Sequence, residues 1–229
     1  MSIFVTHGKV KLALHTLRHG SGRPLLLLHA LGEQSPDEVP ERYQAWPGPV
    51  YALDFTGHGQ SSVPHGGGYT AEILMGDADC ALAMLGEATV VGEGLGAYVA
   101  LLMAGGRPGL VRGAVLCDGA GLTGGGDEPG PVVVRGVTES DKAPDPFALV
   151  ELAEDLRPSD YAANFARLAQ RSSGLDYPIS VAAKTRPDWL KRVLAEPGVC
   201  ESTVEEALAR YASVDRADVS TNSPQSAQM

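Results

Sequence analysis

The sequence predicts a doubly wound α/β fold, with a mostly parallel sheet of about eight strands and an antiparallel pair of strands at its start. Short unbroken apolar runs, such as residues 25–28, are typical of strands that are covered on both faces. Amphipathic segments bounded by helix start and stop signals alternate with these runs. A chain of 229 residues, 44% of them hydrophobic, is long enough to bury its own core. We therefore expect one domain over residues 1–213 and a polar tail without regular structure over 214–229.

The first half of the chain gives the clearest pattern of elements. Residues 3–18 alternate apolar and polar positions around a turn at His7-Gly8, which indicates a hairpin. A helix is expected over 70–86, with Thr70 as its N-cap and Gly86 as its stop signal. Further strands are predicted at 25–28, 49–53, 89–91 and 111–117, and a helix that begins at Leu95 is predicted to end near residues 105–108.

The second half allows two interpretations. Residues 119–130 form a glycine-rich loop, residues 147–171 predict one or two helices around Pro158, and further helices are expected at 187–195 and 202–211. If residues 131–134 are a strand, the run at 178–183 is the last strand of the sheet. If they begin a short lid instead, 178–183 becomes the penultimate strand, the final strand is missing and Asp188 is the nearest acid.

Composition excludes several classes of function. The net charge of −10 is unsuited to a phosphate-binding surface, so nucleic acid is not an expected partner. No apolar run approaches the roughly 20 residues of a membrane span. The three cysteines share no CxxC spacing, so neither a zinc site nor a disulfide framework is expected, and no other cofactor is indicated. The N-terminus lacks the pattern of a secretion signal, which favours a cytoplasmic location.

Three segments carry more specific information: LLLLHALGE at 25–33, ALDFTGHGQSS at 52–62 and VVGEGLGAYVA at 90–100. In order and spacing they resemble the α/β-hydrolase family, with Ala30 where a glycine is expected; Asp54, Gly57, His58, Gly59 and Ser61 reproduce the second motif. The resemblance implies an oxyanion-hole N–H from the first loop and a nucleophile on the strand-to-helix turn of the third segment. Only residues 119–130 lie where such proteins insert a cap, so no sizeable cap domain is expected.

The sequence departs from that family at the positions of the catalytic triad. Gly94 stands at the nucleophile position, and no histidine follows His65. By strand count, the loop that would carry the base holds Lys184, with Thr185 and Arg186. Glu139 or Asp141 is expected at the acid position, with Asp118 as an alternative one strand earlier. Gly94, Asp141 and Lys184 thus form a triad by position only, because an acid without its base orients nothing.

These departures lead to one main functional hypothesis and two alternatives. The main hypothesis is a member of the family without hydrolase activity, which binds a small molecule or a protein partner in the remaining cleft; the expected cleft residues are His29, Ala30, Leu31, Glu93, Leu95 and Asp118. One alternative is a slow or non-standard hydrolase or lyase that uses Glu93, His29 or a bound water on a small ester-like substrate. The other is a dinucleotide-binding protein, because Gly92-x-Gly94-x-x-Ala97 also fits a phosphate-binding fingerprint, with Asp118 as the ribose ligand. The sequence does not predict the oligomeric state.

Individual side chains outside the motifs have simpler interpretations. His29 and His58 are expected to brace loops by hydrogen bonds. Asp77 and Asp79 are expected on the polar side of the 70–86 helix. Lys184 and Arg186 would bind an anion at the former base position or, more commonly for such residues, form surface ion pairs.

Overall fold

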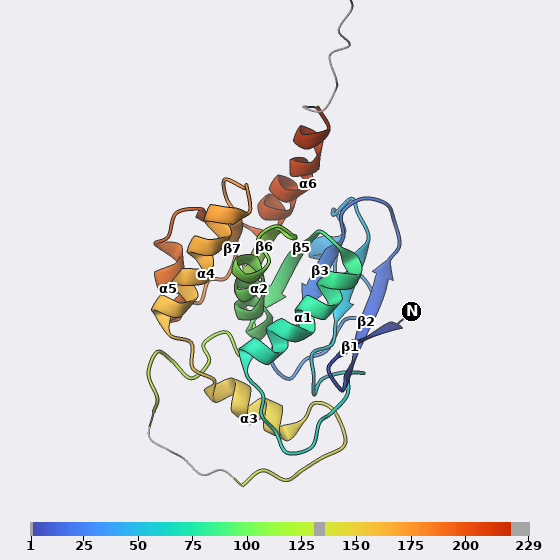
Figure 1. Cartoon of the computed structure of the whole chain (residues 1–229), viewed down its shortest axis with the longest axis vertical. Helices are drawn as coiled ribbons and strands as arrows, with labels where there is room; N and C mark the ends of the chain where they lie inside the picture. Colours follow the sequence, from blue (N-terminus) through green and yellow to red (C-terminus); the bar gives the residue numbers. More distant parts are fainter. Residues whose placement is uncertain (1, 131–135, 221–229) are drawn as a thin grey trace, which may run out of the picture.

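The computed structural model describes residues 2–130 and 136–220, and its centre is one eight-stranded mixed sheet (Figure 1). The strand order is β1-β2-β4-β3-β5-β6-β7-β8. β2 pairs antiparallel with β1 and β4, and all other pairs are parallel. The strands are β1 (Ser2–His7), β2 (Val10–Arg18), β3 (Leu25–Leu28), β4 (Val50–Leu53), β5 (Ala88–Glu93), β6 (Val111–Cys117), β7 (Ile179–Val181) and β8 (Val199–Glu201). The predicted sheet of about eight strands with an antiparallel entry is confirmed.

Helices cover both faces of this sheet, and each face has its own apolar core. The helices are α1 (Ala71–Leu85), α2 (Leu95–Gly106), α3 (Pro146–Glu154), α4 (Ser159–Ser172), α5 (Asp188–Leu194) and α6 (Val204–Ser220), with a 3₁₀ turn, η1 (Glu41–Tyr43). The larger core lies under α1, α2, α4 and α5. The smaller core lies under η1 and α6, where Tyr43 and Tyr211 are buried. Alternate residues of β5 serve the two cores, as Val90 and Val91 show.

The helix signals read from the sequence hold for α1, α3 and α4. Thr70 caps α1, because its hydroxyl accepts a hydrogen bond from the Ile73 N–H at 3.3 Å, and Gly86 ends the helix with φ +78°. Two separate helices, α3 and α4, lie on either side of Pro158. The end of the chain differs from the prediction, because α6 continues through residues 214–220, where a tail without regular structure was expected.

The last strand was not predicted. β8 pairs only with β7 at the edge of the sheet, and its three residues are partly or fully exposed, so they lack the apolar run that marks the other strands. The segment 178–183 therefore contributes the penultimate strand, β7, and the loop with Lys184 follows that strand rather than the last one. Assigning Lys184 to the base position was wrong, since the loop after β8 holds Ser202 and Thr203. The strand expected at 131–134 lies outside the described residues.

One short helix lies at the carboxyl edge of the parallel strands, where the site is expected. Figure 1 shows α3 below the ends of these strands. The Glu151 carboxylate of α3 accepts hydrogen bonds from the N–H groups of Gly68 and Tyr69, both at 2.7 Å. Within residues 2–130 and 136–220, no helix is both long and apolar enough to cross a membrane.

Candidate functional site

The turn between β5 and α2 has the sharp geometry that the third motif predicts. Gly94 joins the strand to the helix with φ +55° and ψ −115°, a backbone conformation that glycine adopts at little cost. A β-carbon on Gly92 would overlap the carbonyl oxygen of Gly96, so this glycine allows the strand and the helix to approach closely. The elbow is therefore built as in a nucleophile-bearing protein, but its apex carries no side chain.

Backbone from another loop fills the space above Gly94. The loop that follows β6 crosses the elbow so closely that a β-carbon on Gly94 would overlap the carbonyl oxygen of Ala120 and lie 2.6 Å from the carbonyl carbon of Gly119. The Ala120 carbonyl oxygen accepts hydrogen bonds from the Leu95 N–H at 2.9 Å and the Leu31 N–H at 3.1 Å. One of these N–H groups opens α2 and the other follows β3, which are the two places that supply an oxyanion hole in the motif. A carbonyl group of the protein itself thus lies where a substrate carbonyl would bind.

Three of the expected cleft residues pack against this loop instead of lining a cleft. Ala30 and Leu95 are fully buried. A β-carbon on Gly121 would lie 2.7 Å from the β-carbon of Leu31 and 3.2 Å from that of Leu95. The small residues around Ala120 therefore allow the loop to settle onto the elbow. The glycine-rich composition of this loop indicated that its backbone could approach another segment closely, but it did not predict that this segment would be the elbow.

Two further expected cleft residues, His29 and Glu93, line a pocket beside the elbow. It has a volume of about 200 Å³ and lies at the ends of β3, β4 and β5, where it is lined by Leu27, Leu28, His29, Glu33, Gln34, Ser35, Pro36, Pro40, Arg42, Ala52 and Glu93. Glu93 accepts hydrogen bonds on Oε1 from the Tyr43 hydroxyl, at 2.8 Å, and from Arg42. The Ser35 hydroxyl is buried and has no hydrogen-bond partner among the described residues.

The thiol nearest this pocket is held in its neutral form. Cys117 ends β6 directly beside Glu93 of β5 and is 4% exposed. Burial, together with the negative charge of Glu93, raises the pKa of the Cys117 thiol to about 12. A thiol with that pKa supplies almost no thiolate at neutral pH, so Cys117 does not replace the missing nucleophile.

His29 and His58 brace the loops around the elbow, as predicted. Nε2 of His29 accepts from the Phe55 N–H at 3.1 Å, and Nδ1 donates to the Ala30 carbonyl oxygen at 2.7 Å. Nε2 of His58 accepts in the same way from the Gly32 N–H at 3.3 Å. Burial, and next the proximity of His58, lowers the pKa of His29 to about 4. Both nitrogens of this neutral ring are engaged, so neither is available to take a proton from a substrate.

The predicted acids do not assemble a triad with Gly94. The Asp118 carboxylate accepts from the N–H groups of Lys184, at 2.7 Å, and Thr185, at 2.9 Å, and so holds the loop after β7. Burial alone would raise the pKa of Asp118, but these backbone hydrogen bonds hold it below its ordinary value. Asp141 is exposed in the loop before α3. No contact between Asp141 and Lys184 or Gly94 is found among the residues that the structure describes.

The residues after β8, where the family resemblance places the base, start a helix instead. The Thr203 hydroxyl accepts from the Glu206 N–H at 3.2 Å, and the Glu206 carboxylate accepts from the Thr203 N–H at 2.8 Å. This reciprocal pair is a capping box at the start of α6. Only Ser202 and Thr203 separate β8 from α6, so the short connection is occupied by helix capping.

The second motif supports the site from beneath. The Asp54 carboxylate accepts from the N–H groups of Ser35 and Gln60, both at 2.7 Å, and from Nε2 of His15 at 2.9 Å. The Ser61 hydroxyl donates to the Asp54 carbonyl oxygen at 2.6 Å. Asp54 thereby positions the segment that carries the pocket residue Ser35.

Asp77 is buried, so its predicted place on the polar side of α1 was wrong. Its carboxylate contacts Nδ1 of His7 and accepts from the Thr56 N–H, both at 2.8 Å. These two partners come from β1 and from the loop after β4, and their proximity to α1 arises only in the folded chain. Asp79, by contrast, is partly exposed and pairs with Arg107 at 2.6 Å.

The elbow does not offer the free phosphate site that the dinucleotide alternative needs. In that fingerprint the pyrophosphate contacts the first N–H groups of the helix. Here the Leu95 N–H donates to Ala120, and both oxygens of Asp118 accept backbone hydrogen bonds. In the described part of the chain, no group of three or more His, Cys, Asp or Glu side chains could hold a metal ion.

Comparisons with known proteins agree with this architecture. The sequence model of the Alpha/beta hydrolase family matches residues 19–222. The structure is similar to a thioesterase domain from the curacin biosynthetic pathway, with a TM-score of 0.66, 16% identity, and coverage of 93% of this chain and 98% of that one. It is also similar to an N-formylmaleamic acid deformylase from Pseudomonas putida, with a TM-score of 0.63, 16% identity, and coverage of 90% and 92%. At these identities the likeness concerns the fold. A comparison with curated protein sequences gave no match.

Proposed function

The chain belongs to the Alpha/beta hydrolase family, and from that premise we propose that it performs no serine-based hydrolysis and instead binds a small polar molecule beside the elbow. The proposed site is the pocket lined by His29, Ser35, Arg42 and Glu93. The observation that carries the proposal is the Ala120 carbonyl oxygen, which accepts from both Leu31 and Leu95 above Gly94. Membership of the family sets the fold, whereas the function depends on these particular residues.

The loss of acyl transfer is inferred from the groups that this chemistry requires. A nucleophile, a base and oxyanion donors must converge on one carbonyl group. Gly94 offers no nucleophile, and a substrate carbonyl would have to displace Ala120 before it could reach the two N–H donors. The buried imidazole of His29 has both nitrogens engaged, so it is a poor substitute for the base.

Binding is inferred from the place and the chemistry of the pocket. Ligands of α/β proteins characteristically bind at the carboxyl ends of parallel strands, and this pocket lies at the ends of β3, β4 and β5. Glu93 offers acceptors, Arg42 offers donors, and the Ser35 hydroxyl can do both. A volume of about 200 Å³ suits a small ligand that carries hydrogen-bond donors and acceptors better than a protein segment.

An ester assay tests the first half of the proposal and its enzymatic alternative. Purified wild-type protein is incubated with p-nitrophenyl acetate and butyrate, beside Glu93→Gln and the matched control Glu87→Gln, which changes an exposed acid at the opposite end of the same strand region. We expect equal rates for all three proteins, at the level of an unrelated protein. Turnover that Glu93→Gln abolishes and Glu87→Gln preserves would establish the slow hydrolase instead.

A ligand screen tests the second half. Thermal shift is measured with ethanolamine, glycerol and serine as probes. A probe at 100 times its Kd should stabilise the fold by about 2.7 kcal/mol. We expect a shift that Ser35→Ala and Glu93→Gln remove and that Glu87→Gln retains. Shifts that persist in both pocket variants would place the binding elsewhere, and a lack of any shift with these probes would contradict the proposed ligand class.

A further inference from the structure

A second polar site lies away from the elbow, around a buried cation without a carboxylate partner at hydrogen-bond distance. Arg157 precedes α4 and is 1% exposed. Its Nη1 donates to the Leu122 carbonyl oxygen at 2.5 Å, whereas Nε and Nη2 are buried and have no hydrogen-bond partner among the described residues. Its guanidinium carbon lies 4.7 Å from the centre of the Tyr98 ring. A buried guanidinium with two unused donors is unfavourable unless something accepts from them.

Arg157 remains charged despite its burial. Burial lowers the pKa of Arg157 to about 10, while the carboxylates of Asp155 and Glu72 act on it in the opposite direction. The Asp155 carboxylate is itself engaged, because it accepts from the Ala71 N–H at 2.9 Å at the start of α1. At neutral pH the guanidinium is therefore protonated, and its Nε and Nη2 groups lack an acceptor among the described residues.

Arg157 forms part of the wall of a pocket with a volume of about 190 Å³ between the glycine-rich loop and α5. Arg186, Lys191 and the indole of Trp189 line the same pocket, together with the carboxylates of Asp127 and Asp188. Lys191 pairs with Asp188 at 2.8 Å, but both side chains are highly exposed, so this ion pair is weak. Arg186 pairs in addition with Glu201 at 3.2 Å, so Arg157 is the one cation of this wall that is both buried and without a carboxylate at hydrogen-bond distance among the described residues.

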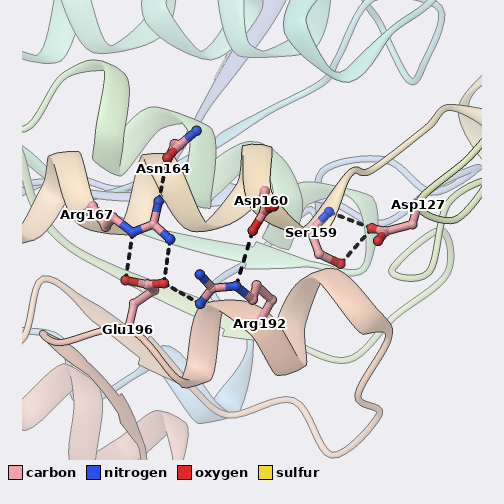
Figure 2. A network of polar contacts seen from close by, with 7 residues as sticks. All are labelled: Asp127, Ser159, Asp160, Asn164, Arg167, Arg192 and Glu196. Carbon is pink, nitrogen blue, oxygen red and sulfur yellow. Dashed lines mark hydrogen bonds and ion pairs between the residues drawn. The ribbon is translucent and has the colours of Figure 1, made fainter.

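A polar network holds the walls of this pocket in place (Figure 2). Asp127 accepts from the N–H and the hydroxyl of Ser159, at 2.5 and 2.6 Å, which joins the glycine-rich loop to the start of α4. At the far end of the network, Glu196 accepts from both Arg167 and Arg192. Asp127 is thus already satisfied, and the helix that carries Trp189 is fixed against the helix that follows Arg157.

We propose that this pocket binds a small monocarboxylate, whose two oxygens accept from Nε and Nη2 of Arg157 while its apolar part contacts Trp189. The parallel N–H groups of a guanidinium match the spacing of a carboxylate, and this geometry favours a carboxylate over a spherical anion. Asp127 and Asp188 on the rim disfavour a second negative charge on the ligand. Gly124 keeps a side chain away from this edge of the guanidinium, since a β-carbon there would lie 2.5 Å from Nε and 2.8 Å from Cδ of Arg157.

Tryptophan fluorescence tests this proposal directly. The full chain carrying Trp46→Phe has Trp189 as its single emitter, because the sequence contains two tryptophans. Sodium butyrate is titrated at constant ionic strength, with butylamine as a probe of the same shape and opposite charge and inorganic phosphate as a dianion. We expect saturable binding of butyrate with a Kd of about 1–10 mM, in keeping with so small a ligand, and no saturation with butylamine. Phosphate should bind at least tenfold more weakly.

Variants separate the pocket from other causes of a signal. Arg157→Met should abolish butyrate binding, and Arg157→Lys should weaken it at least tenfold, because a point charge cannot form the bidentate contact. Lys191→Met, an exposed substitution that keeps the fold intact, should weaken binding a few-fold by removing a rim cation. If Arg157→Met does not fold, Gly124→Ala serves in its place, since its new β-carbon closes the Nε edge. Equal affinity in Gly124→Ala or Arg157→Met, or no saturation below 100 mM in the parent, overturns the proposal.

Discussion

An alanine at position 94 would not fit unless the loop after β6 moves. Its β-carbon would overlap the Ala120 carbonyl oxygen, so Gly94→Ala must break the hydrogen bonds from Leu31 and Leu95 or distort the elbow. A side chain at φ +55° and ψ −115° costs about 1–3 kcal/mol in backbone strain. Two backbone hydrogen bonds contribute about 0.5–1.5 kcal/mol each. The expected loss in free energy of unfolding is therefore about 2–6 kcal/mol.

The chain offers a matched control for this experiment. Gly86 has φ +78° and ψ −140°, close to the values at Gly94, but a β-carbon there meets no atom within 4 Å. Gly86→Ala should therefore show only the strain of about 1–3 kcal/mol. The difference between the two variants isolates the contact with the loop.

Urea unfolding, followed by tryptophan fluorescence and circular dichroism, gives both free energies. We expect Gly94→Ala to be less stable than Gly86→Ala by at least about 1 kcal/mol, which is the smallest net contribution expected from the two hydrogen bonds to the Ala120 carbonyl oxygen. If the two variants lose the same stability, the space above Gly94 is open in solution, and the inference drawn from Ala120 fails.

Three further predictions concern the supports of the site. The folded pKa of His29, about 4, lies below its ordinary value of 6.5, so the unfolded chain binds a proton at this residue that the folded chain does not bind at pH values between the two. The free energy of unfolding should therefore drop by about 2 kcal/mol between pH 7 and pH 5. His29→Gln should remove that share of the pH dependence, whereas the exposed control His19→Gln should retain it. Ser61→Ala loses the bond from the Ala13 N–H of β2 and the bond to the Asp54 carbonyl oxygen within the loop after β4. It should lower the free energy of unfolding by about 1–3 kcal/mol in urea titrations, and an unchanged midpoint would contradict the buttressing role. Thr70→Ala should cost about 1 kcal/mol by removing the cap of α1, measured by thermal unfolding, whereas Thr70→Ser should cost little.

Local signals in the sequence were enough for the central strands and the capped helices. The run Leu25–Leu28 is apolar at every position because β3 is buried on both faces, and Thr70 marks the start of α1 by its own chemistry. Such features depend on residues that are neighbours along the chain. Gly94 and the absence of a histidine after His65 could likewise be read directly from the sequence.

Features that depend on contacts between distant segments could not be predicted. β8 is three partly exposed residues, which become a strand only because β7 offers its edge. Asp77 resembles an ordinary polar helix residue until His7 is brought to it across 70 positions of sequence. The position of Ala120 likewise depends on three loops that meet at one edge of the sheet.

Because Ala120 lies against the elbow, the residue that position 94 can hold depends on the path of residues 119–121. A serine at 94 and the present path of the loop exclude each other on steric grounds, so neither a mutation nor a designed substitution at 94 alone would produce a working nucleophile. A protein engineer would first have to redirect residues 119–121, then lengthen the connection between β8 and α6 to carry a base. Each of these steps weakens the fold before any catalytic benefit arises, which makes the present arrangement difficult to reverse by single steps.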